Sequence, residues 1–235
     1  MIDTQTQEII YNATNVFWNE HVSNEAFREI TQGKEIGHRI ADFVDERTTS
    51  RLVSERDLTA TFEYNSKGRK MLRSMGDIWI KSSGIYNPIN IKAGIVTEGS
   101  PNVVSLTKLL TRLLKHQIDS YYLLIVKFKE LQKQYQPHIY FVDLLDYLDF
   151  TIFDLGPGQV MLREKQFYER ADSGKKPPAL SLHDKVDKCV AIMHDAYDRL
   201  LNNRKTRIDN LTKQISQFKK ANDFTVNQEG LFFNG

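Results

Sequence analysis

The period at which apolar residues recur changes near residue 58, and this change constrains the fold more than any other feature. After it, residues 59–64, 76–81 and 88–95 form short segments rich in β-branched and aromatic residues, bounded by Gly, Ser and Asn, which predicts strands. Before it, the spacing is three and four residues, as on one face of a helix. The residues that carry this helical spacing are Ile9, Ile10, Ala13, Val16, Phe17, Ile36, Ile40, Phe43 and Val44.

The chain after residue 100 predicts further helices and strands. An apolar-periodic stretch opens at residues 100–102 and ends in Lys115 and His116, cations that suit a helix C-terminus. Dense apolar runs at 121–128 and 138–145 predict strands covered on both faces, and a turn at 156–158 separates two more, at 151–154 and 159–162. The predicted fold class is α/β, a mixed central β-sheet flanked by helices.

The C-terminal part predicts a long helix or a helical pair. From Leu182 to Phe218 the apolar residues alternate between four- and three-residue spacing, with an interruption near Asn202 where we expect a bend. With 235 residues the chain is long enough for one sizeable core. We therefore expect a single domain: helices over 1–58, a sheet core over 59–170 and C-terminal helices over 181–220.

Composition excludes several classes of protein. Hydrophobic residues make up 40% of the chain and charged residues 26%, and no apolar run approaches the roughly 18 residues of a membrane span, so we expect no membrane partner. The first eight residues lack the features of an export signal. The lone Cys189 fits a reducing cytoplasm and excludes an internal disulfide or a cysteine zinc site. Neither a Gly-x-Ser-x-Gly elbow nor a Gly-x-x-x-x-Gly-Lys loop is present.

Charge is informative only where it clusters. The net charge of +2 is too small to indicate nucleic acid binding by itself. Residues 66–81, however, carry five cations against one acid, and residues 204–220 carry six against one. Both clusters suit contact with phosphates, and both suit equally a solvated helix or loop face.

One segment carries candidate chemistry. It runs Gly-Asp-Ile-Trp-Ile over 76–80, turns through Gly84, and continues as Asn-Pro-Ile-Asn-Ile-Lys-Ala-Gly over 87–94. On two adjacent strands, Asp77, Asn90 and Lys92 would share one face, because alternate residues of a strand lie on the same side. Asp77 and Asn90 offer the hard oxygens that Mg²⁺ prefers, and Lys92 would favour the deprotonated form of an attacking water, as phosphodiester hydrolysis requires. A turn aspartate and an exposed strand lysine are the structural alternatives.

These residues resemble the PD-(D/E)XK nuclease superfamily, whose members carry an aspartate, a short hairpin, and then acid-x-lysine on the next strand. Residues 98–109, Glu-Gly-Ser-Pro-Asn-Val-Val-Ser-Leu-Thr-Lys-Leu, are similar to the Pro-Asn-aliphatic-aliphatic-Ser segment that follows the catalytic lysine in some type II restriction endonucleases. The order of helices, catalytic hairpin, helix, further strands and C-terminal helices also agrees. The resemblance spans residues 30–170.

The resemblance implies a restriction-endonuclease-like fold and a site-specific endonuclease that cuts double-stranded DNA with Mg²⁺ and leaves 5′-phosphates. It further implies a homodimer in a bacterial or archaeal cytoplasm, with a cognate DNA methyltransferase as genetic partner. In this scheme Asp77, Asn90 and Ile91 bind the metal. Lys81, Ser100, Asn102 and Lys108 would contact the DNA. Asn102 is equally suited to cap a helix.

Two positions depart from the family pattern. Asn90 stands where a carboxylate is usual, which removes one negative charge. Many relatives also carry a glutamate that lies four residues after a glycine in an N-terminal helix and reaches toward the metal. Here Ala41 stands four beyond Gly37, so Glu35 and Asp42 are the nearest substitutes as metal ligands. Two alternative functions therefore stay open: a non-catalytic DNA-binding or helical assembly protein, and a structure-selective repair nuclease of the same superfamily.

Overall fold

A five-stranded mixed sheet forms the centre of the protein. The computed structural model describes residues 1–31, 36–71, 74–95, 102–131 and 134–220, leaving aside the side chains of 36–39, 94–95 and 220. The sheet has the order β1-β2-β3-β5-β6, with β3 and β5 parallel and the other neighbours antiparallel. Its strands are β1 (Thr59–Thr61), β2 (Ile78–Ser82), β3 (Ile85–Ile95), β5 (Tyr122–Leu131) and β6 (Gln134–Asp143). The predicted mixed sheet is confirmed.

The strand β5 separates two apolar cores because its side chains alternate between the faces of the sheet. Tyr122, Leu124, Val126 and Phe128 enter one core, and Leu123 and Ile125 enter the other. A strand covered on both faces is expected to be a continuous apolar run, which is how residues 121–126 are composed, with Lys127 and then Phe128 following.

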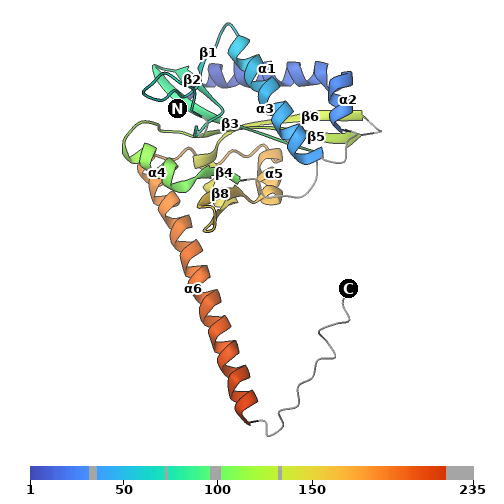
Figure 1. Ribbon diagram of the computed structural model, residues 1–235. Helices are drawn as coiled ribbons and strands as arrows, with labels where there is room; N and C mark the ends of the chain where they lie inside the picture. The colour runs from blue at the N-terminus through green and yellow to red at the C-terminus, as the bar shows by residue number, and fades with distance from the viewer. Residues whose placement is uncertain (32–35, 72–73, 96–101, 132–133, 221–235) are drawn as a thin grey trace. The chain divides into compact units, whose positions relative to one another are not determined.

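Three helices cover the first face: α1 (Thr4–His21), α2 (Glu25–Thr31) and α3 (Ile36–Ser54) (Figure 1). Asp3 caps α1 by accepting a hydrogen bond from the Thr6 amide at 2.8 Å. The fully buried Trp18 of α1 packs edge-on against Phe128 of β5, with ring centroids 5.3 Å apart. The helices predicted for the N-terminal part are confirmed.

The second face is covered by a smaller sheet and short helices. The small sheet has the order β4-β8-β7, with β4 (Asn102–Ser105), β7 (Thr151–Asp154) and β8 (Gln159–Leu162). Around it lie α4 (Leu106–Leu114) and α5 (Glu164–Asp172) (Figure 1), and the 3₁₀ segment η1 (Leu144–Phe150) packs in the same core. The bounds predicted for the last two strands are confirmed.

The helix predicted to open at residues 100–102 and to end at Lys115 and His116 is formed, but Asn102 lies in a strand before it, and residues 100 and 101 lie outside the described residues. Residues 102–105 pair antiparallel with β8, with an irregular register between Asn102 and Val104, and the β-branched Val103 and Val104 are both buried in the core on this face. The helix begins only at Leu106, and its cap is Ser105, whose side chain accepts a hydrogen bond from the Lys108 amide. Asn102 therefore does not cap a helix.

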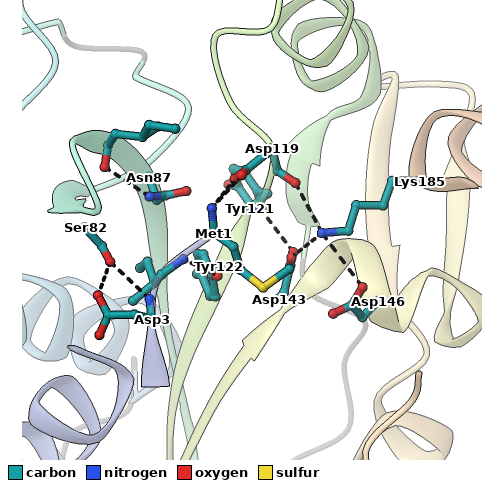
Figure 2. Close-up of polar contacts among 12 residues, drawn as sticks. Met1, Asp3, Ser82, Asn87, Asp119, Tyr121, Tyr122, Asp143, Asp146 and Lys185 are labelled. Carbon is teal, nitrogen blue, oxygen red and sulfur yellow. Dashed lines mark hydrogen bonds and ion pairs between the residues drawn. The ribbon is translucent and has the colours of Figure 1, made fainter. Parts of the chain in front are cut away.

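A buried ion pair fixes the first turns of α6 (Leu182–Lys220) to the end of the main sheet. Lys185 is 1% exposed, and its Nζ lies 2.8 Å from Asp143 Oδ2 and 3.2 Å from the carbonyl oxygen of Asp119 (Figure 2). Asp146 Oδ1 stands 3.8 Å from the same nitrogen. Asp143 also accepts hydrogen bonds from the amides of Tyr121 and Leu145, so its oxygens are well satisfied.

The chain forms two compact units, residues 1–193 and 194–235. Within the second unit the structure describes residues 194–220, all in α6. Of the two alternatives predicted for this part, the long helix is confirmed and the helical pair is not, since α6 continues as one helix through Asn202, where a bend was expected. Among the described residues, none of the helices is both long enough and apolar enough to cross a membrane.

Candidate functional site

The candidate site begins where β2 and β3 separate. The Asp77 amide donates to the Ile89 carbonyl at 2.9 Å, which is the last backbone bond before the two strands diverge. Beyond that point the Asp77 side chain takes the place of a partner strand, since its Oδ2 accepts a hydrogen bond from the Ile91 amide at 2.7 Å. The carboxylate is thereby fixed at the open edge of β3.

Gly76 permits the close approach of the two strands at this corner. A Cβ at Gly76 would lie 2.9 Å from Pro88 Cβ and 3.0 Å from the amide nitrogen of Ile89. Real Cβ atoms essentially never come as near to another atom as the Pro88 Cβ would be, and the contact with the Ile89 backbone is tighter than most. A glycine directly before Asp77 is therefore a steric requirement of the geometry that places the carboxylate.

Asn90 and Lys92 lie on the same face of β3. Ile89 and Ile91 enter the core under the N-terminal helices, so the residues that alternate with them point to the opposite face. Asn90 is 8% exposed, and its Nδ2 donates to the Val103 carbonyl at 3.3 Å.

The amide oxygen of Asn90 is a buried acceptor that lacks a hydrogen-bond partner among the described residues. Leaving such an oxygen unsatisfied costs about 1 to 3 kcal/mol. A buried oxygen of this kind is expected to bind a water molecule, a cation or a hydrogen-bond donor of a ligand. Burial, reinforced by the negative charge of Asp77, raises the pKa of the Tyr121 hydroxyl, so this hydroxyl also lies near the Asp77 carboxylate.

Asp45 of α3 is a site residue that the sequence analysis missed. Its Oδ1 accepts a hydrogen bond from Thr49 Oγ1 at 3.2 Å. Burial, reinforced by the negative charge of Asp77, raises the pKa of Asp45 to about 6, while Thr49, Lys92 and Lys70 act in the opposite direction. An acid whose pKa responds to a neighbouring carboxylate in this way lies in the same local environment as that carboxylate.

Lys70 and Lys92 compensate part of this negative charge. Burial raises the pKa of Asp77, and the Ile91 amide, Lys92 and Lys70 counteract that rise. The Lys70 ammonium lies 3.8 Å from the centre of the Phe62 ring, which holds it beside a cleft of about 620 Å³. Asp45 and Asp77 line the same cleft. The cleft thus combines two carboxyl groups with the Lys70 ammonium group. Lys92 lies near enough to lower the pKa of Asp77, but neither Lys92 nor Asn90 is among the residues that line the cleft.

The acids proposed from the sequence are placed differently. Asp42 lies on α3 one turn before Asp45, with an exposed side chain at the rim of the cleft. Glu35 lies outside the described residues. One feature of the sequence could have indicated Asp45. It directly follows the core residue Val44 and precedes Thr49 by four residues, which places it at the border of the helix face that packs on β3.

The structure does not bring the proposed DNA-binding residues together with the acids. Lys81 is exposed near the hairpin end of β2, about 13 Å along the strand from Asp77 at the usual rise per residue, and its Nζ lies 5.7 Å from the Tyr86 ring centre. Asn102 and Lys108 have exposed side chains on β4 and α4. Ser100 lies outside the described residues.

Within the part of the chain that the structure describes, no three His, Cys, Asp or Glu side chains form a metal-binding group. Any cation at this corner would therefore depend on two carboxylates together with amide or carbonyl oxygens. No protein-family model and no curated protein sequence matches this chain. The case for a function therefore depends on the geometry of the corner.

Proposed function

We propose that the protein is a Mg²⁺-dependent endonuclease of the type II restriction kind, with its active site at the corner of Asp77, Asp45, Asn90 and Lys92. The observation that carries the proposal is the Asp77 carboxylate held on the Ile91 amide beside a second, half-buried acid and a lysine. An ordinary turn aspartate or exposed strand lysine does not account for this grouping.

The arrangement of the strands supports the proposal. Two antiparallel pairings lead from β1 through β2 to β3, the chain then passes through α4, and β5 joins β3 in parallel. This is the order of hairpin, helix and further strand on which the resemblance to PD-(D/E)XK nucleases is based. The acid and the lysine lie on adjacent strands where these separate.

The donor set fits a magnesium ion. Asp77 and Asp45, which line one cleft, offer hard oxygen donors, and Asn90 Oδ1 on the other face of β3 is a buried oxygen with an unfilled acceptor position. Ile91 adds its carbonyl, since the N–H and C=O of one strand residue point to the same side and its N–H points to Asp77. When bound, Mg²⁺ would neutralise charge on a scissile phosphate and lower the pKa of a water molecule.

The lysines have separate roles in this proposal. Lys92 lies on the strand that carries Asn90, where its positive charge favours the hydroxide form of the attacking water. Lys70 lines the cleft and meets the phosphate charge of the incoming strand. The product would carry a 5′-phosphate. We further propose a homodimer acting on a short symmetric site in double-stranded DNA, with a DNA methyltransferase as genetic partner.

Cleavage of phage DNA in Mg²⁺ tests the proposal directly. We expect discrete fragments from the wild type, none in EDTA, and none from Lys92→Ala, which should still bind DNA because the lysine acts on the water. Lys175→Ala, an exposed lysine in the loop before α6, is the matched control and should cut normally.

The outcomes distinguish the alternatives. Retardation of DNA without cutting would favour the non-catalytic DNA-binding or assembly protein. Cutting of branched DNA without defined fragments would favour a repair nuclease. If Lys92→Ala cuts within about tenfold of the wild type, its assignment to the attacking water is wrong.

A further inference from the structure

The second half of α6 carries a stripe of exposed apolar side chains. Exposure is 50% for Tyr197, 63% for Leu201, 63% for Ile208, 51% for Leu211 and 53% for Ile215. With Arg204 between them, these residues follow one another at alternating four- and three-residue spacing. That spacing makes Leu201, Ile208 and Ile215 the a positions of a heptad, and Tyr197, Arg204 and Leu211 the d positions.

We propose that this stripe is the seam of an antiparallel two-stranded coiled coil between two copies of the chain. The inference is independent of the proposed nuclease activity. Soluble chains seldom leave an apolar stripe of this length in water, and an a/d stripe, interrupted here at Arg204, is the surface that a second helix of the same kind covers.

The charges select the antiparallel orientation. In a parallel pair, equivalent positions meet, so Arg204 would face Arg204 of the second copy inside the seam. In an antiparallel pair, a positions face d positions. With Ile208 opposite Leu211, Arg204 lies opposite Ile215 instead, and the like charges are separated.

The flanking positions select the register. In the alignment just described, the e position Asp198 lies beside Lys219 of the second copy, and two-fold symmetry forms this pair twice. Sliding one helix by a heptad in one direction brings Lys205 against Lys205, and in the other direction Lys205 against Lys219. Only the central register therefore joins opposite charges at these positions and avoids repulsion.

Charge exchange in the full-length protein tests both orientation and register. We expect the wild type to sediment as a dimer at micromolar concentration. Asp198→Lys and Lys219→Asp should each weaken the dimer about tenfold, because each replaces two attractions by two repulsions. The double variant, and an equimolar mixture of the two single variants, should regain wild-type affinity, because every new charge then meets an opposite one.

A seam variant gives the second readout. Leu211→Asp should produce a monomer, whereas Asn210→Asp, the adjacent exposed position off the seam, should leave the dimer intact. Circular dichroism establishes that the helix persists in each variant. A monomeric wild type, a dimer that survives Leu211→Asp, or a double charge exchange no tighter than the single variants would each overturn the proposal.

Discussion

At the scale of the residue, Asp45 has the pKa that most affects behaviour. Its pKa is raised from 3.8 to about 6, so between these values the folded protein binds more protons than the unfolded chain does. The contribution of Asp45 to stability is therefore present below this window and is lost as pH rises through it. Partial exposure to solvent reduces its size.

In EDTA, we expect the melting temperature of Asp45→Asn to rise relative to that of the wild type as the pH increases. The change should take place between pH 3.8, the ordinary pKa of an aspartate, and about 6. Thermal unfolding of both proteins across that range measures the difference. Asp42→Asn is the control, since Asp42 is exposed one turn earlier. A constant difference in melting temperature at every pH would show that the Asp45 environment does not raise its pKa.

Asn90 offers a second test at the same scale. Asn90→Asp adds a carboxylate to a partly desolvated site, so it should tighten Mg²⁺ binding and lower the concentration for half-maximal cleavage. It also removes the donor to the Val103 carbonyl, so the metal-free protein should be less stable. An unchanged magnesium requirement would place Asn90 away from the ion.

At the scale of the element, the junction of β2 and β3 depends on the absence of a side chain at Gly76. Gly76→Ala forces a methyl group against Pro88 and the backbone of Ile89, which have no flexible end that can move aside. We expect a loss of about 1 to 3 kcal/mol in unfolding free energy. Urea denaturation checks this, with Gly156→Ala as control, where the new Cβ meets only Asp154 Oδ1 at 3.4 Å. Equal stability of the two variants would contradict the close approach.

The elements also show what local patterns can and cannot predict. The hairpin at residues 76–95 and the strands at 151–154 and 159–162 follow from alternation and turn residues, which are local. The start of α4 does not, because Val103 and Val104 also fit a helical period and only their pairing with β8 makes them a strand. Asp45 was missed for a similar reason: its relation to Asp77 depends on how α3 packs on β3, more than thirty residues further along the chain.

At the scale of the whole molecule, Lys185 joins segments that are far apart in the sequence. Its ammonium group meets Asp143 and Asp119 with almost no contact with water, and burial raises the pKa of Asp143 while Lys185 opposes that rise (Figure 2). Lys185→Met would leave Asp143 buried without its counter-charge. We expect a loss of about 3 to 5 kcal/mol.

The double variant Lys185→Met with Asp143→Asn provides the comparison, because it removes both charges and should recover much of that loss. Chemical denaturation of the two single variants and the double variant measures the coupling. Lys188→Met, which breaks an exposed ion pair with Asp149, should change stability by less than about 1 kcal/mol. Strict additivity of the Lys185 and Asp143 variants would refute the coupling.

The bond that holds Asp77 has a consequence for how such a site can vary. The group that anchors the carboxylate is the peptide N–H of Ile91, which every amino acid except proline supplies. The side chain at that position has only to fill the core under the helices, so many apolar residues would serve there. Two chains can therefore hold an aspartate at the same corner while sharing little sequence identity. A common pattern of backbone hydrogen bonds would then relate two such sites that a sequence comparison does not.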